Sequence, residues 1–177
     1  TARDWRELEA AVSVGRTAGE RAVRRLGARQ LGTMKVPVLY SPDVARGLVG
    51  HFIGAIRGGS QYRRASFLLD AAGQQVFPDW FALSERPHLP RALASAPFDH
   101  EGVATHDREL VAGGVLLGYV LSTYSARKLG LRTTGNAGGS HNLVVSHGED
   151  DLPALLRRMG RGLLVTEQLG QGVNPVT

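Results

Sequence analysis

The six histidines of the sequence are the first residues to test for metal chemistry, because neutral imidazole is a common zinc ligand. A helical zinc site places two histidines on one helix face with a glutamate between them. His51 stands alone in its segment, whereas His100 and His106, like His141 and His147, lie six positions apart. Six extended residues span about 20 Å, which is too far for two side chains to share one ion. No metal ligand is therefore assigned to this chain, and His51 is best interpreted as a structural residue.

The carboxylates are densest around Asp99, Glu101 and Asp107, where they could perform acid–base chemistry or bind a cation. Solvated acids in a turn that leads into a strand are the more ordinary interpretation. The chain has no cysteine, which excludes a thiolate nucleophile and a disulfide. It also lacks a G-x-S-x-G elbow, a P-loop and a G-x-G-x-x-G fingerprint. The sequence thus carries no complete catalytic centre of its own.

The glycine-rich segment Gly135–Gly139 could in principle cradle an anion with its backbone N–H groups. It lacks the lysine and the fixed spacing of a phosphate-binding loop. A turn or a substrate-contact loop is therefore the favoured interpretation of this segment.

Composition limits the class of protein. The 177 residues are 42% hydrophobic and 21% charged, which is typical of a globular domain with one core. No apolar run approaches the roughly 20 residues of a membrane span, and the N-terminus does not resemble a signal peptide, so we expect a cytoplasmic protein without membrane contact. The net charge of +5 comes mostly from arginine. We do not expect a nucleic-acid partner, because no basic run exceeds two residues and no aromatic side chains alternate with the basic ones.

Apolar periodicity and capping residues predict four helices. The longest has the clearest start, with Ser41 as a cap, Pro42 in the first turn and Asp43 at the positive helix end. Its glycines recur every three or four residues, which suggests that another backbone packs closely on that side. The four predicted helices cover residues 4–14, a segment from Thr17 to about Gly27, 43–57, and 151–159.

Short apolar runs bounded by turn residues predict the strands. A hairpin is expected over 107–122, because Gly113 and Gly114 can adopt the positive φ of a tight turn. Pro37 favours an edge position for the first strand, or a place at the start of that strand. The remaining strands are expected at 35–40, 66–70, 75–83, 142–146 and 163–166. Helices come first and strands follow, which predicts an α+β fold: N-terminal helices, then a mostly antiparallel, barrel-like or open sheet of short strands.

One ordered series of motifs is more specific than any of these patterns. Its densest part runs from Pro97-Phe98-Asp99-His100-Glu101-Gly102 to Thr133-Thr134-Gly135-Asn136-Ala137-Gly138, and it resembles the F-D-x-E-G … TGNA signature of the TldD/PmbA family. Between these ends lie Leu110–Leu116, Tyr119–Leu121 and Tyr124–Gly130, and the match is extended by Ser66–Asp70 and Thr166–Thr177. The resemblance covers nearly the whole chain from Thr17 onward.

The resemblance implies two subunit types. The TldD type carries an H-E-x-x-x-H zinc motif on a helix, and the PmbA (TldE) type lacks it. Placing that helix at 43–57 puts its first histidine at Arg46, its glutamate at Gly47 and its second histidine at His51. Arg46 is cationic and Gly47 has no carboxylate to activate water, so the site is degenerate. The chain is thus similar to the C-terminal-domain portion of a PmbA-type subunit.

The resemblance also carries expectations about organisation and partners. Residues 1–33 would be the end of a preceding domain or a connector, and 34–177 a C-terminal domain that is incomplete at its C-terminal end. The chain would be a non-catalytic subunit that binds peptide or unfolded protein and completes a zinc-bearing TldD-type metalloprotease subunit, with a homodimer as another possible assembly. It would hold no cofactor itself. We expect substrate or partner contacts at Asp99, Glu101, Thr105, Gly135 and Asn136.

Two alternatives stay open from the sequence. One is a hydrolase with a non-zincin site built from His51, Asp99 and Glu101. The other is a nucleic-acid-associated modulator, which the arginine excess and the family's proposed link to DNA gyrase suggest.

Overall fold

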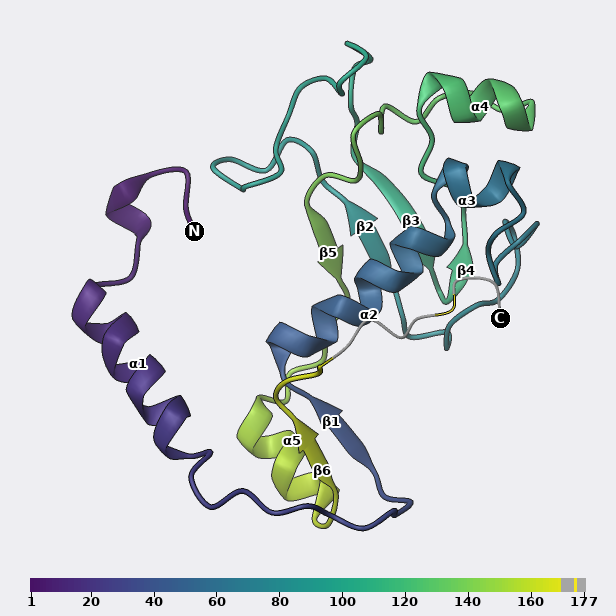
Figure 1. Ribbon diagram of the computed structural model, residues 1–177. Coiled ribbons are helices and arrows are strands. Elements are labelled where there is room, and N and C mark those ends of the chain that lie inside the picture. The colour runs from purple at the N-terminus through teal and green to yellow at the C-terminus, as the bar shows by residue number, and fades with distance from the viewer. Residues whose placement is uncertain (170–173, 175–177) are drawn as a thin grey trace.

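The computed structural model describes residues 1–169 and residue 174, which form helices, short strands and long connecting loops (Figure 1). The expected α+β class is confirmed. No helix in this part of the chain is long and apolar enough to cross a membrane. The elements in chain order are η1 (Trp5–Glu7), α1 (Ala11–Val23), β1 (Val38–Tyr40), α2 (Pro42–Ala55), α3 (Gly58–Tyr62), β2 (Leu83–Glu85), β3 (Arg108–Ala112), β4 (Val115–Leu116), α4 (Thr123–Leu129), β5 (Leu143–Val145), α5 (Leu152–Met159) and β6 (Leu163–Val165).

The larger sheet is open and has four strands in the order β4-β3-β2-β5, with every neighbouring pair antiparallel. The hairpin predicted over 107–122 is confirmed as β3 and β4. Gly113 and Gly114 form its turn with φ of 54° and 76°, a region that strains any residue with a side chain. A Cβ on Gly114 would also lie 2.1 Å from the carbonyl oxygen of Phe77, so the segment before β2 packs directly on this turn.

Helix α2 lies across this sheet (Figure 1). Apolar side chains from α2 and its C-terminal end pack on the sheet. Phe52, Ile53 and Ile56 pack in one cluster with the strand residues Leu83, Leu110, Val111 and Leu116. Full burial of such a side chain contributes about 1.5–3 kcal/mol to folding. This cluster therefore fixes the C-terminal half of α2 against the sheet.

The start of α2 agrees only in part with the capping predicted from the sequence. Pro42 occupies the first turn and Asp43 faces the positive helix end, as predicted. Ser41 holds the N-cap position, but its hydroxyl makes no capping hydrogen bond and has no partner among the described residues. Its backbone N–H instead donates to the Val165 carbonyl at 2.9 Å, which joins the helix to β6.

The prediction that another part of the chain packs closely on the glycines of this region holds at only one of the four positions. A Cβ on Gly58 would lie 2.3 Å from the Ser125 hydroxyl, so α3 does pack tightly on α4 there. At Gly47, Gly50 and Gly54 the prediction is wrong, because within the described part of the chain nothing lies within 4 Å of a Cβ built at these positions. These three glycines leave an open surface on α2.

A second, smaller unit joins β1 and β6 in a parallel pair beside α5 (Figure 1). Pro37 precedes β1, and its carbonyl accepts from Leu163 N–H at 2.9 Å; the edge position predicted for this strand is confirmed. Helix α5 begins after Asp151, whose side chain accepts from the Ala154 N–H at 2.8 Å.

The N-terminal helices differ from the prediction. The segment expected as one helix over 4–14 begins with the single 3-10 turn η1. The Asp4 side chain accepts from the backbone N–H of Arg6, and at Leu8 the backbone becomes extended, which ends the turn. Helix α1 begins at Ala11, so Thr17 lies inside it and caps nothing. None of its residues is buried.

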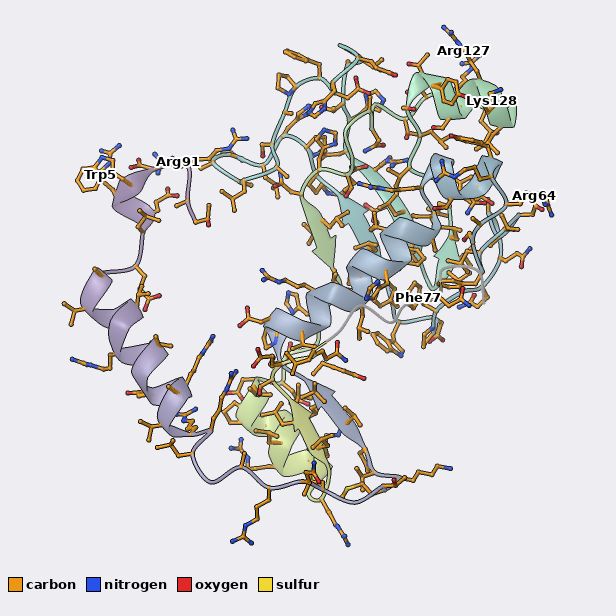
Figure 2. The ribbon with its side chains drawn as sticks, viewed as in Figure 1. Trp5, Arg64, Phe77, Arg91, Arg127 and Lys128 are labelled. Carbon is orange, nitrogen blue, oxygen red and sulfur yellow. The ribbon has the colours of Figure 1, made fainter. Side chains whose placement is uncertain are left out.

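The N-terminus reaches the loop between β2 and β3. Arg91 on that loop pairs with Glu7 at 3.0 Å, and Figure 2 shows Arg91 close to Trp5. Arg3 donates to the carbonyl oxygen of Ser95 at 2.7 Å. These polar contacts hold η1 on the loop, whereas α1 contributes nothing to the core.

The prediction of a strand at residues 66–70 is wrong. The Ser66 hydroxyl accepts from Leu68 N–H at 2.9 Å and Asp70 has a φ of 54°, so the segment turns. The strand predicted at 75–83 is displaced toward the C-terminus, because the observed strand β2 runs from Leu83 to Glu85. Within the predicted range, Gln75 makes an isolated bridge to Val115.

Candidate functional site

The three positions predicted for a degenerate metal site lie on α2. Arg46, Gly47 and His51 are all exposed, and no hydrogen bond or ion pair orients the Arg46 or His51 side chain within the described residues. Guanidinium does not coordinate zinc, and glycine offers no carboxylate, so His51 is the only potential donor of the three. The residues present do not fit a zinc ion. No group of three His, Cys, Asp or Glu side chains in the described ranges is placed to share a metal ion.

Asp99 organises the turn that follows the 86–97 loop. One carboxylate oxygen accepts from the backbone N–H of Glu101 at 2.8 Å and of Val103 at 3.0 Å, and the other accepts from Ala137 N–H at 2.8 Å. Burial acts to raise the pKa of Asp99, but these N–H groups outweigh it and hold the pKa below its usual range. Asp99 is therefore a buried, ionised structural acid that ties the turn to the glycine-rich loop.

Glu101 and Thr105 continue this turn. Glu101 accepts from the Thr123 N–H at 2.8 Å and so satisfies a free donor in the first turn of α4. Thr105 is buried, donates to the Ala96 carbonyl at 2.6 Å and lies 3.1 Å from the His88 ring nitrogen. Both side chains are engaged within the chain, so the turn itself is rigidly held.

The sequence contains one His-Glu dipeptide, at His100 and Glu101, and it lies in this turn and not on a helix. The position five residues after His100 is Thr105, so the zinc motif is not formed there either. The imidazole of His100 lies against Gly138, where a Cβ would approach its Nδ1 to 2.4 Å. This contact again joins the turn to the glycine-rich loop.

Gly135 and Asn136 shape that loop from inside. Gly135 has a φ of 68°, and a Cβ there would lie 2.8 Å from the Ala104 carbonyl oxygen, so only glycine fits without movement. Asn136 is buried, and its Nδ2 donates to Glu85 Oε1 at 2.7 Å. Its Oδ1 accepts from Arg108 at 2.8 Å and from the Thr134 hydroxyl at 2.7 Å.

Glu85 is the centre of a buried polar network that the sequence did not reveal. Its side chain is 2% exposed and accepts from Arg108 Nε at 2.8 Å. The backbone N–H of His141 donates to Glu85 at 2.7 Å, and the imidazole Nδ1 of His141 lies 3.1 Å away. Burial acts to raise the pKa of Glu85, but the His141 N–H, Arg108 and Asn136 outweigh it and lower the pKa.

A signal for Glu85 does exist in the sequence. It lies two positions after Leu83 in a short strand, so both side chains point to the same face, which is the core face. An acid there needs a cationic partner, and Arg108 lies opposite it in the β2–β3 register. The register depends on the fold and could not be read from the sequence.

Two adjoining cavities lie near these loops and share Arg57 and Gly59 in their linings. The first, of about 340 Å³, lies between α3, the start of α4 and the glycine-rich loop; it is lined in part by Tyr62, Tyr124, Asn136 and Gly139. The second, of about 450 Å³, follows α2 and α3 and is lined in part by His51, Gly54 and Arg63. The structure thus brings His51 and Asn136, which are far apart in the sequence, to neighbouring cavities.

The hydrolase alternative requires His51, Asp99 and Glu101 to act together. His51 lines the second cavity, and neither carboxylate lines it. Asp99 is buried and accepts three backbone N–H groups, while Glu101 accepts from the start of α4. The geometry gives no support to a catalytic group made of these three residues.

Comparison with known proteins places this fold among metallopeptidase domains, and in this chain α2 offers His51 alone as a potential metal donor of the three positions. Residues 33–177 match the PmbA/TldA metallopeptidase C-terminal domain. The chain is 53% identical over 176 residues to a protein described as a metalloprotease PmbA homolog in Haemophilus influenzae, which covers 99% of this chain and 39% of that protein. The chain belongs to the PmbA/TldD family of metallopeptidases, and it is of the PmbA type.

Solved structures of related proteins share this fold. A crystal structure of a proposed modulator of DNA gyrase from Bacteroides thetaiotaomicron superposes with a TM-score of 0.92 at 31% identity, covering 99% of this chain and 39% of that one. The structure of TldE from Thermococcus kodakarensis superposes with a TM-score of 0.72 at 26% identity, covering 89% of this chain and 39% of that one. The chain thus spans about two fifths of the length of the relatives that it matches.

Proposed function

We propose that the protein carrying this chain is the non-catalytic partner of a zinc-bearing, TldD-type metalloprotease subunit. The observation that carries the proposal is α2: in a family of metallopeptidases, this helix presents Arg46, Gly47 and His51 to solvent and offers one potential zinc ligand. The reaction would then take place on the partner, with zinc bound there. The cysteine-free sequence fits a cytoplasmic location for this assembly.

In this proposal the chain contributes shape and peptide binding. The buried carboxylate of Asp99 ties its turn to the glycine-rich loop, and the buried carboxylate of Glu85 ties that loop to β2. Such a rigid loop cluster is suited to line a chamber, because its surface does not have to be ordered when a substrate or subunit binds. The five residues predicted as contacts would therefore act mainly by holding this surface, and peptide or unfolded protein would be the substrate of the assembly.

The test is reconstitution from full-length proteins. A mixture of the full-length protein with a zinc-bearing homologue from the same cell is expected to form a complex by size-exclusion chromatography and to cleave an unfolded peptide, with loss of cleavage on chelation. The replacement Arg46→Ala in this chain should leave the cleavage rate within about twofold, whereas replacing a zinc ligand in the partner should abolish it. Metal-dependent cleavage by this protein without any partner would refute the proposal.

A DNA-associated role is the second candidate, because a solved relative is described as a proposed modulator of DNA gyrase. Figure 2 shows Arg64, Arg127 and Lys128 projecting from the region of α3 and α4. Binding through such residues would release counterions, so the affinity for duplex DNA would fall steeply as salt rises. Measuring that affinity between 50 and about 200 mM salt decides this candidate.

A further inference from the structure

The guanidinium of Arg57 is free in a chain where many arginines are paired. No hydrogen bond or ion pair of its side chain is present among the described residues. Its backbone is nevertheless fixed, because Gly58 N–H donates to the Val120 carbonyl at 2.9 Å and Val120 N–H donates to Ile56 at 3.0 Å. The Nη2 atom lies 3.0 Å from a Cβ built on Gly139, so the guanidinium rests over the glycine-rich loop.

Arg63 approaches the same place from α3. Its guanidinium lies 5.3 Å from the centre of the Tyr62 ring, and Nη1 donates to the Tyr62 hydroxyl at 3.1 Å. The same group lies 3.3 Å from a Cβ built on Gly59, which like Arg57 lines both cavities. Arg63 has no carboxylate partner in the described part of the chain, whereas its neighbour Arg64 lies 3.9 Å from Asp70.

The two guanidinium groups lie at cavities without acidic walls in the described part of the chain. Among the described residues, no aspartate or glutamate lines either cavity. Asn136 in the wall of the first cavity donates to Glu85, but that carboxylate is buried and paired with Arg108. Arg57 has no partner and Arg63 has no carboxylate partner among the described residues, and both lie at a concave surface whose described lining has no acid. Such a pair favours an anionic ligand, since guanidinium can form paired hydrogen bonds with a carboxylate.

The walls also suit a peptide. Gly50 and Gly54 are open on the α2 side, which lets a main chain approach closely. Tyr62 and Tyr124 meet edge to face, with ring centres 5.8 Å apart, and provide an aromatic wall. Cavities of about 340 and 450 Å³ are large enough for a few side chains. A DNA duplex instead needs basic residues spread over an exposed surface.

We propose that the two cavities form one groove in which Arg57, assisted by Arg63, binds a carboxylate of an extended peptide segment. The carboxylate would be an aspartate or glutamate side chain or the C-terminus of the peptide. This inference rests on the proposed function and deepens it, because it names the chemistry by which the non-catalytic subunit selects peptides. The groove runs beside His51, so the degenerate metal helix contributes to binding.

The test measures peptide binding to the full-length protein by fluorescence anisotropy. The probes are labelled ten-residue peptides of one sequence: one with a central glutamate and an amidated C-terminus, one with glutamine in its place and an amidated C-terminus, and one with glutamine and a free C-terminus. We expect one or both carboxylate-bearing peptides to bind on the order of tenfold more tightly than the uncharged one. The peptide that shows the preference identifies the source of the carboxylate.

The variants assign the preference to the groove. Arg57→Gln is expected to remove it, and Arg63→Gln to reduce it about threefold. Arg161→Gln is the matched control, because Arg161 is also exposed and free of partners among the described residues but lies between α5 and β6. It should keep the full preference. Thermal unfolding of each variant confirms that the fold is retained, and Arg63→Gln serves as the test if Arg57→Gln unfolds.

Equal binding of all three peptides would overturn the inference, and so would an unchanged preference in both groove variants. The inference would also fail if duplex DNA bound more tightly than the peptides and that DNA binding were lost in Arg57→Gln. These results would leave the proposed function standing if the reconstituted complex still cleaves peptide. Conversely, the absence of any complex with a zinc-bearing homologue would refute the proposed function, while a carboxylate preference that depends on Arg57 would survive.

Discussion

Replacing Glu85 tests whether the buried polar network holds the fold together. In Glu85→Ala the Nε of Arg108 and the backbone N–H of His141 lose their acceptor, and the Nδ2 of Asn136 keeps only the Gly139 carbonyl at 3.2 Å. The Arg108 side chain is 18% exposed and would remain charged. Breaking a buried ion pair from one side costs about 3–5 kcal/mol. Because Arg108 keeps its bonds to the Tyr119 carbonyl at 3.0 Å and to Asn136 at 2.8 Å, we expect the lower end, about 3 kcal/mol.

The chain offers a matched control on the same pair of strands. Glu109 on β3 pairs with Arg86 beyond the end of β2, but the Glu109 side chain is 39% exposed. An exposed pair contributes only about 0–1 kcal/mol, so Glu109→Ala should cost less than about 1 kcal/mol. Both variants are measured by urea unfolding of the 177-residue chain, with circular dichroism and tryptophan fluorescence as two probes of one transition.

The pH dependence supplies a second readout for Glu85. Its pKa is lower in the folded chain than in the unfolded chain, so its carboxylate stabilises the fold above the ordinary glutamate pKa of about 4.3. That contribution is lost as the pH falls from there through the folded-state value. In the isosteric variant Glu85→Gln this loss cannot occur, so its stability should fall less steeply below about pH 4.3 than that of the unmodified chain. Equal costs for Glu85→Ala and Glu109→Ala, or parallel pH profiles, would refute the reasoning.

Substitutions at three further positions test the local geometry, each by the shift in the urea midpoint. Gly47→Ala should stabilise the chain by about 0.5–1 kcal/mol, because the position is helical and open, and a destabilisation would show that something packs there. Gly135→Ala should cost about 2 kcal/mol or more, since a Cβ would lie 2.8 Å from the Ala104 carbonyl at a φ of 68°, and an unchanged midpoint would contradict this geometry. Asp151→Ala should cost about 1 kcal/mol by removing the cap on Ala154, whereas Asp151→Asn, which keeps an acceptor, should cost less.

Local signals predicted those elements whose causes are local. Two adjacent glycines between apolar runs predicted the β3–β4 hairpin, and the Ser41-Pro42-Asp43 start predicted α2. Local signals failed where a side chain offered the backbone another partner. Ser66 accepts the N–H of Leu68 and turns a segment whose apolar residues predicted a strand. The glycines of α2 predicted a neighbour, but a glycine permits close approach without showing whether anything approaches.

The sequence by itself determined the family and the loss of the metal donors, because both depend on which residue types follow one another along the chain. In any conformation the guanidinium of Arg46 does not coordinate zinc, and Gly47 has no carboxylate to activate water. Only the tertiary structure decided what Asp99 and Asn136 do: both were expected at a contact surface, and both are buried in networks that join segments 28 to 56 residues apart. Arg57 became a candidate binding residue for the same reason. Whether a charged group is paired depends on which distant residues the fold brings to it.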